Sequence, residues 1–217
     1  MQLYFGAVPA TQKRWPGRLR SAGQGVSRSL KTREAAMSDL QLIRNCAPTL
    51  AGMKVGSLFN VMEKEEAQVN FWLERWNALL NGKGVHVRCL KYTGSAALMY
   101  VYRMEALDEQ LSQPAVQALM RQMNYPAGGS VRQIDHLAAH LKNHSEFPHE
   151  IGLFLGYPLE DVWGFMCKKG RDYKCSGCWK VYGDAEKAKA CFAKYRRCTN
   201  HFVKHYKNGV TLCQLTV

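Results

Sequence analysis

The sequence predicts an α/β protein of the α+β type, in which a small, mostly antiparallel sheet of three to five strands packs with about six helices. Two patterns carry this prediction. Residues 63–80 place apolar side chains three and four positions apart, which is typical of a helix with one buried face. Residues 85–92 alternate apolar and polar side chains, and residues 97–103 follow after a Thr-Gly-Ser turn, which is typical of a pair of strands.

Shorter patterns predict the other elements. Helices are expected in five further segments: residues 40–50 (a short helix or turn), 105–123 with a break near Pro114, 130–143, 148–156 and 158–169. Strand composition marks three more segments: residues 51–59, 179–182 and 210–217. Asp184 has the side chain of an N-cap, which predicts a long helix that ends near Tyr206.

Charge is spread unevenly along the 217 residues. Residues 1–36 hold seven Lys/Arg and one acid without apolar periodicity, so we expect a disordered basic extension from a misassigned start, followed by one globular domain over 37–217. The alternative for this extension is a basic arm that binds nucleic acid or a targeting peptide. Residues 167–217 hold twelve Lys/Arg and three acids, which indicates either an anionic partner such as nucleic acid or a solvated helix face. No run approaches the roughly 18 apolar residues of a membrane span, so no membrane partner is expected.

Eight cysteines occur in the chain, and the first residues lack the basic region of a signal peptide. We therefore expect a cytoplasmic protein with free thiols or a metal site, rather than a disulfide framework. Cys175 and Cys178 have zinc-knuckle spacing, and His201 and His205 on the predicted long helix would complete four ligands. The alternative is that the cysteines pack as small apolar side chains, so the sequence leaves the metal and any cofactor open.

The segment 147–165 combines three glycines and two prolines with the adjacent pair His149–Glu150. A structural interpretation is that two short helices begin at the prolines, while Gly152 and Gly156 let another backbone approach closely. A catalytic interpretation is that the imidazole and the carboxylate form a general acid/base pair at a helix start.

The same segment also has the residue pattern of a helix-turn-helix, which would place the helix from Pro158 in a major groove of DNA. Glu160 and Asp161 argue against this interpretation, because both acids would lie on its leading face and repel phosphates. A separate loop, residues 46–54, joins a thiol, a hydroxyl, a glycine bend and one lysine. Its Thr49 and Lys54 could donate to a bound anion, although the phosphate-loop pattern is missing.

Four segments together resemble a bacterial family of unknown function, the domain-of-unknown-function family numbered 3793. They are CAPTLAGMK at 46–54, LMYVYR at 98–103, PHEIGLFLGYP at 148–158 and GCWKVY at 177–182. The resemblance spans about residues 37–200 and implies a cytoplasmic protein of anaerobic bacteria with no established reaction and a redox- or iron-linked accessory role. Cys178 departs from the tyrosine found at this position in many relatives, which counts against an obligatory zinc site. The matched positions imply a candidate site of Cys46, Thr49, Lys54, Tyr102, Arg103, His149, Glu150, Tyr157, Trp179 and Lys180.

The resulting hypothesis is a protein that binds a small molecule or a protein partner in one cleft lined by the four segments. His149, Glu150 and Lys54 would form its polar centre, and Tyr157 and Trp179 its walls. If the protein is an enzyme, His149 and Glu150 would transfer a proton on an anionic substrate held by Lys54. The two alternatives are a nucleic-acid-binding regulator and a zinc-binding module at Cys175 and Cys178.

Overall fold

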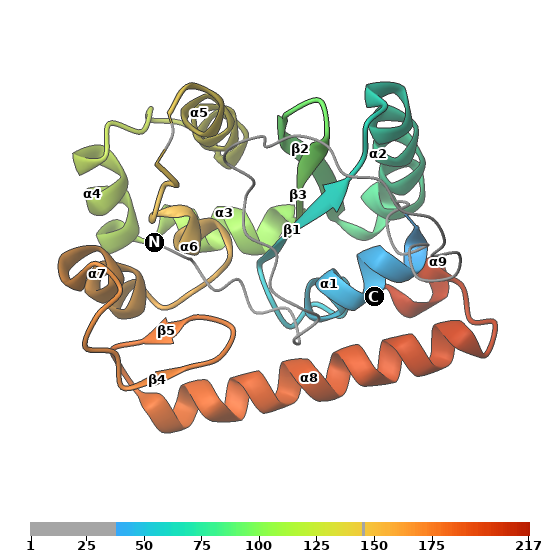
Figure 1. The fold of residues 1–217 in the computed structure, drawn as a ribbon. Helices are drawn as coiled ribbons and strands as arrows, with labels where there is room; N and C mark the ends of the chain where they lie inside the picture. The colour runs from blue at the N-terminus through green and yellow to red at the C-terminus, as the bar shows by residue number, and fades with distance from the viewer. Residues whose placement is uncertain (1–37, 145) are drawn as a thin grey trace, which may run out of the picture.

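A three-stranded antiparallel sheet lies at the centre of the computed structural model, which describes residues 38–144 and 146–217 (Figure 1). Its strands are β1 (Gly56–Met62), β2 (Val85–Tyr92) and β3 (Ala96–Arg103). They lie in the order β1-β3-β2, so β3 is central and β1 forms one edge. The register pairs Gly56 with Tyr102 and Val85 with Arg103.

Both faces of the sheet are covered by helices. Successive side chains of β3 point to opposite sides of the sheet, and those on either side are buried in a separate core. Met99 and Val101 belong to a first core, and Tyr100 and Tyr102 belong to a second. The helices that contribute to the first core are α1 (Asp39–Leu50), α2 (Glu66–Leu80), α8 (Ala185–Lys207) and α9 (Leu212–Leu215). Those of the second core are α3 (Met104–Ser112), α4 (Pro114–Gln122), α5 (Ser130–Asn143), α6 (Ile151–Phe154) and α7 (Leu159–Lys168). Figure 1 shows the two groups on opposite sides of the sheet.

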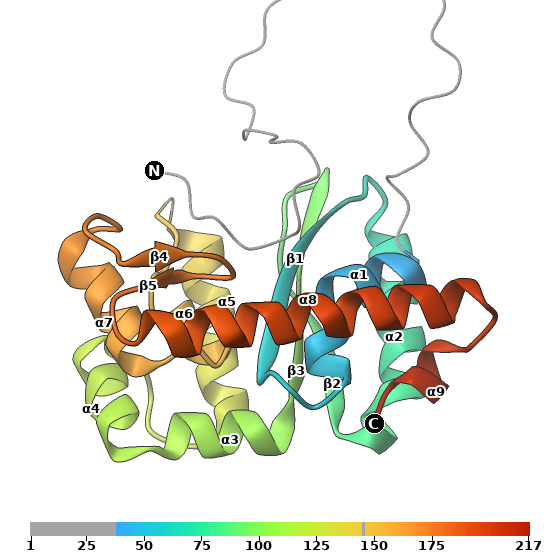
Figure 2. The ribbon, with the colours of Figure 1, turned by 90° about the horizontal axis from the view of Figure 1, so that it is seen from below.

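The long helix α8 runs along one side of the molecule, from a small hairpin to the loop that leads into α9 (Figures 1 and 2). The hairpin consists of β4 (Cys175–Ser176) and β5 (Lys180–Val181). Near its start, Ala188 of α8 packs with Trp179 and Val181 of the hairpin, in a third, small apolar cluster. Near its end, Phe202 packs in the first core. Helix α8 therefore bridges the hairpin and the first core.

The predicted fold class is confirmed: the described residues form a mixed α+β fold with a three-stranded antiparallel sheet and a two-stranded hairpin. They contain nine α-helices, seven of them with at least seven residues, and a short 3₁₀-helix at Asn81–Lys83. The predicted N-cap is also confirmed, since the Asp184 carboxylate accepts from the backbone N–H groups of Glu186 and Lys187, both at 3.0 Å. The predicted basic extension over 1–36 lies outside the described residues.

The prediction of a strand over 210–217 is wrong. Thr211 opens a capping box, in which its hydroxyl accepts from the Gln214 N–H and the Gln214 side chain accepts from the Thr211 N–H. This reciprocal pairing starts a helical turn, α9, in a segment whose composition alone favours a strand. No helix in the described part of the chain is long and apolar enough to cross a membrane.

Candidate functional site

A cleft of ≈ 590 Å³ lies between α1, the edge strand β1, the hairpin and α8. Much of its wall is apolar or aromatic, and three of its side chains are cationic, namely Arg44, Lys54 and Arg196. Neutral polar groups come from Asn45, Ser57, Asn60, Ser176 and Thr199. No carboxylate belongs to the wall among residues 38–144 and 146–217. The cleft is therefore a cationic site with apolar walls, which suits an anion.

Lys54 reaches the cleft because the chain reverses at the end of α1. Gly52 has φ +70°, in the left-handed region that favours glycine, and the Met53 N–H donates to the Pro48 carbonyl at 2.8 Å. The Tyr195 hydroxyl of α8 donates to the Met53 carbonyl at 3.3 Å. The turn that carries Lys54 is thus fixed from both α1 and α8.

Two glycines bring this turn against the segment around α6. A Cβ on Gly156 (φ +73°) would lie 2.6 Å from Val55 Cγ2, and a Cβ on Gly56 would lie 2.6 Å from the Phe154 carbonyl oxygen. Real Cβ atoms do not approach other heavy atoms so closely. The predicted close approach at Gly156 is present, although its nearest atoms belong to the Val55 side chain, and the Val55 backbone nitrogen would lie 3.5 Å from the Cβ. These contacts join residues 52–56 to residues 154–157.

Tyr157 and Trp179, the predicted walls, lie against each other with ring centroids 4.7 Å apart. The Tyr157 hydroxyl donates to the Cys178 carbonyl at 3.2 Å, and Trp179 packs edge-on against Phe192 of α8 at 4.6 Å. The Lys54 amine lies 5.4 Å from the centroid of the Tyr157 ring. Burial raises the pKa of the Tyr157 hydroxyl, so this side chain stays neutral.

The charge of Lys54 is poorly compensated. Burial lowers the pKa of its amine, because desolvation disfavours the ammonium, and the thiols of Cys178, Cys46 and Cys191 oppose this shift. Burial also raises the pKa of the Cys46 and Cys178 thiols, so both are neutral near pH 7. Lys54 forms no ion pair with a carboxylate in the described residues.

His149 lines a different and much smaller cavity of ≈ 50 Å³, with Phe165 and Lys180. Its Nδ1 is buried and has no hydrogen-bond partner among the described residues, and its ring lies edge-on to Phe165 at 4.9 Å. Burial lowers the pKa of the His149 imidazole, against the opposing effect of Glu150. The space accommodates a few water molecules but no larger ligand. Tyr157 and Cys178 separate this cavity from the cleft, since both residues line both spaces.

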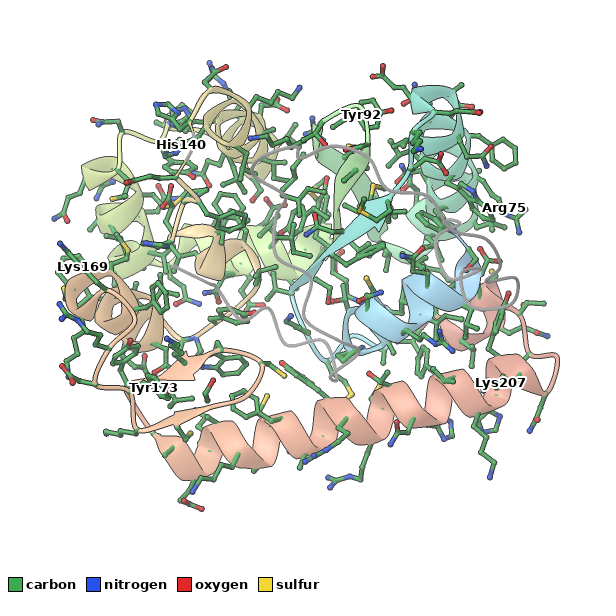
Figure 3. All side chains as sticks on the ribbon, viewed as in Figure 1. Arg75, Tyr92, His140, Lys169, Tyr173 and Lys207 are labelled. Carbon is green, nitrogen blue, oxygen red and sulfur yellow. The ribbon has the colours of Figure 1, made fainter. Side chains whose placement is uncertain are left out.

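Glu150 lines neither space. It is 2 % exposed, its carboxylate accepts from the Tyr125 hydroxyl at 3.0 Å, and the His140 ring nitrogen of α5 lies 3.6 Å away (Figure 3). The predicted polar centre of His149, Glu150 and Lys54 is therefore not assembled. The reason is local geometry: adjacent residues in a helical turn point about 100° apart, so His149 and Glu150 face different surroundings.

Two predicted site residues from β3 also lie away from both spaces. The Tyr102 ring is buried and stacks on Tyr100 with centroids 4.8 Å apart. The Arg103 guanidinium donates to the carbonyls of Thr49 at 2.7 Å, Leu50 at 2.6 Å and Val217 at 2.6 Å. It therefore ties the end of the chain to the end of α1.

The remaining predicted residues support the cavities from outside or line the small one. Cys46 is buried and lines neither space. The Thr49 hydroxyl forms a 2.9 Å hydrogen bond with the hydroxyl of Ser57, which lines the cleft. The Lys180 amine donates to the Gly170 carbonyl at 2.7 Å, and this lysine lines the small cavity. Thr49 therefore supports the floor of the cleft without lining it.

Asp161 is a site residue that sequence reasoning missed. Its carboxylate accepts from the Trp179 indole N–H at 2.7 Å and from the N–H groups of Tyr182 and Gly183 at 2.7 and 2.8 Å. Asp161 is 4 % exposed, so it would not present a carboxylate to DNA in the way that the helix-turn-helix interpretation requires. Three donors that point inward outweigh the usual preference of an acid for water. Asp161 thereby fixes the hairpin that holds Trp179.

Arg44, Tyr195 and Arg196 were also missed. Arg44 comes from α1 and the other two come from α8, near the other end of the described chain. The basic composition of residues 167–217 is the one signal that pointed toward this region. It cannot distinguish Arg196, which lines the cleft, from the other exposed cations of α8.

The two alternative sites find little support in the geometry. In the described residues, no group of three or more His, Cys, Asp or Glu side chains is placed to hold a metal ion, although the rings of His201 and His205 lie 4.2 Å apart. Cys175 and Cys178 sit instead in the apolar cluster of the hairpin. Helix α6 has four residues, which is too short for the first helix of a helix-turn-helix.

A family model described as a protein of unknown function (DUF3793) matches residues 42–216. The chain belongs to the DUF3793 family. The expected resemblance is thereby confirmed, and the matched region of this DUF3793 protein contains every residue that lines the cleft. No curated protein and no solved structure matches the chain.

Proposed function

We propose that the protein binds a small anionic molecule with an apolar or aromatic part in the cleft around Lys54. The observation that carries this proposal is the charge of the wall: three cations and no carboxylate among the described residues. A volume of ≈ 590 Å³ is typical of small-molecule sites. This proposal keeps the predicted small-molecule function and moves its polar centre from His149 and Glu150 to Lys54.

The distribution of groups supports an anion with an apolar body. Arg44 comes from α1 and Arg196 from α8, and the Lys54 amine lies 5.4 Å from the centroid of the Tyr157 ring. Phe59 and Phe192 supply apolar surface to the same wall. An anionic group of a ligand would pair with Lys54, which has no carboxylate partner among the described residues.

The test is a titration of the full chain with 8-anilinonaphthalene-1-sulfonate, a fluorescent aromatic anion. We expect saturable binding of one dye molecule, because the cleft offers one cationic, apolar site. Lys54→Met should weaken binding about tenfold or more, since a hydrogen bond to a charged group contributes roughly 1.5–3 kcal/mol.

Lys64→Met is the matched control, because Lys64 is an exposed lysine outside the cleft. It should bind the dye like the unaltered protein. Equal affinities for all three proteins, or no saturable binding, would refute the cleft as an anion site. Circular dichroism of each variant verifies that the fold is unchanged.

A second candidate function has its own supporting observation, the outer face of α8. The helix carries seven Lys/Arg residues, all exposed, and one acid, Glu186. Lys194, Arg197 and Lys204 recur at three- and seven-residue spacing and therefore share one face. Lys207 marks the end of this helix in Figure 3. Such a rigid basic rod supports binding to the phosphate backbone of nucleic acid, through α8 rather than through α6 and α7.

This candidate predicts salt-sensitive binding to double-stranded DNA without sequence preference. Three phosphate contacts would give a slope of about −3 in log K against log salt concentration. The triple change Lys194→Glu, Arg197→Glu and Lys204→Glu should abolish binding and leave dye binding in the cleft intact. Fluorescence anisotropy with a labelled duplex measures the first effect. No binding at low salt, or binding that ignores the triple change, would exclude α8 as the contact.

A further inference from the structure

Lys54 differs from the other half-buried lysines of the described residues in what its amine contacts. The amines of Lys83, Lys91 and Lys180 each donate to a backbone carbonyl, at 2.6, 2.5 and 2.7 Å. These acceptors favour the protonated amine. Lys54 has neither a carbonyl nor a carboxylate acceptor among the described residues, and its nearest named contact is the face of the Tyr157 ring at 5.4 Å.

The surroundings of Lys54 make its neutral amine easier to reach than that of an exposed lysine. Burial lowers its pKa, and the thiols of Cys46 and Cys178 are neutral because burial raises their own pKa. Lys54 also has no hydrogen-bond acceptor among the described residues that would favour its ammonium form, and its amine faces the Tyr157 ring. A lysine amine that is desolvated in an apolar pocket is a common setting of a nucleophilic amine.

We propose that Lys54 is a nucleophile that forms an imine with an aldehyde carried by the anionic ligand of the cleft. This inference rests on the proposed function, and it names the reactive group of the ligand. The neutral amine attacks the carbonyl carbon and gives a carbinolamine, which loses its hydroxyl and one amine hydrogen as water. One amine and one aldehyde are thereby converted to one imine and one water, with no oxidant or reductant.

The rest of the cleft fits this reaction. Arg44 and Arg196 are available to hold the anionic group, which leaves the aldehyde toward Lys54. The Tyr157 ring would stabilise the protonated imine, because a cation over an aromatic face is attracted by the ring. Both roles use side chains that the cleft already presents.

Pyridoxal 5′-phosphate serves as the probe, because it combines an aromatic ring, a phosphate and an aldehyde. The full chain is mixed with one equivalent and reduced with cyanoborohydride, and the adduct is located by peptide mass spectrometry. We expect the first equivalent on Lys54 ahead of every other lysine. Lys54→Arg, which places a cation at this position but forms no imine, should lose this adduct, and Lys64→Arg should retain it.

Pyridoxine 5′-phosphate, which has an alcohol in place of the aldehyde, separates the two levels of the proposal. Its displacement of the fluorescent dye measures anion binding alone. If it displaces the dye from the unaltered protein and from the Lys54→Arg variant, while pyridoxal 5′-phosphate labels surface lysines evenly, the anion site stands and the imine is overturned. If neither compound displaces the dye and Lys54 is not labelled first, both proposals fail.

Discussion

The carboxylate of Asp161 should determine whether the hairpin keeps its shape. Asp161→Ala removes the acceptor of three N–H groups, of which the Trp179 indole is buried and the other two are half-buried. An unsatisfied buried donor costs about 1–3 kcal/mol, and water can reach the half-buried pair in part. We therefore expect a loss of about 3–5 kcal/mol in the free energy of unfolding. Glu160→Ala, an exposed neighbour in the same helical turn, should cost about 1 kcal/mol or less.

Asp161→Asn provides a sharper test of the same contact. Its amide can accept from one side only, so its NH₂ group must face a donor, and we expect a loss of about 1–3 kcal/mol. Trp179→Phe removes the indole N–H, so it should cost about 1–2 kcal/mol less in the Asn background than in the unaltered protein. Urea unfolding followed by far-ultraviolet circular dichroism measures each of these proteins. If Asp161→Ala costs no more than Glu160→Ala, or the cycle shows no coupling, the carboxylate does not hold the hairpin.

Three further predictions concern packing, the chain end and pH. Gly56→Ala should cost about 1–3 kcal/mol in urea unfolding, because its Cβ would meet a backbone carbonyl at 2.6 Å, whereas Gly82→Ala has open space and should stay within about 0.5 kcal/mol. Arg103→Met should lower the free energy of unfolding by about 1.5–3 kcal/mol, because its hydrogen bonds to three carbonyls are lost. Arg75→Met, which removes a surface ion pair, should lower it by less than about 1 kcal/mol. The pKa of Lys54 is lowered below 10.5 in the folded protein, so the unfolded chain binds more protons in the pH window just below 10.5. The free energy of unfolding, measured relative to the Lys54→Met variant, should therefore rise with pH in that window. A difference between the two proteins that does not change with pH would contradict the lowered pKa.

Local patterns were sufficient for most elements of the fold. The strand over 85–92 and the helix over 130–143 have the bounds that the sequence predicts. The segment 210–217 was predicted wrongly, because its strand-like composition is outweighed by the capping box that opens at Thr211. Periodicity reports which face of an element is buried, whereas a cap is a specific pair of hydrogen bonds, so the two signals can disagree.

The site was harder to predict than the fold. The sequence identified segments that lie close together, but it did not give the direction in which their side chains point. Each of the four marked segments contributes at least one residue to the cleft, among them Lys54, Leu98 and Tyr157. Sequence spacing cannot state where each side chain points once these segments meet. Glu150 points inward to Tyr125 rather than toward the cleft, and Asp161 points inward to the hairpin.

Helix α8 explains why the basic end of the chain and the cleft cannot be considered separately. The side of α8 toward the cleft supplies Tyr195 and Arg196 to its wall, while Lys194 and Arg197 do not line it. Both faces belong to one rigid element of 23 residues, about 34 Å long. Because Tyr195 also donates to the Met53 carbonyl next to Lys54, a ligand that pairs with Lys54 meets a wall fixed by α8 itself. An anion in the cleft would neutralise charge beneath the same helix whose outer face is basic, so occupancy of the cleft should weaken, rather than strengthen, the attraction of α8 for a polyanion.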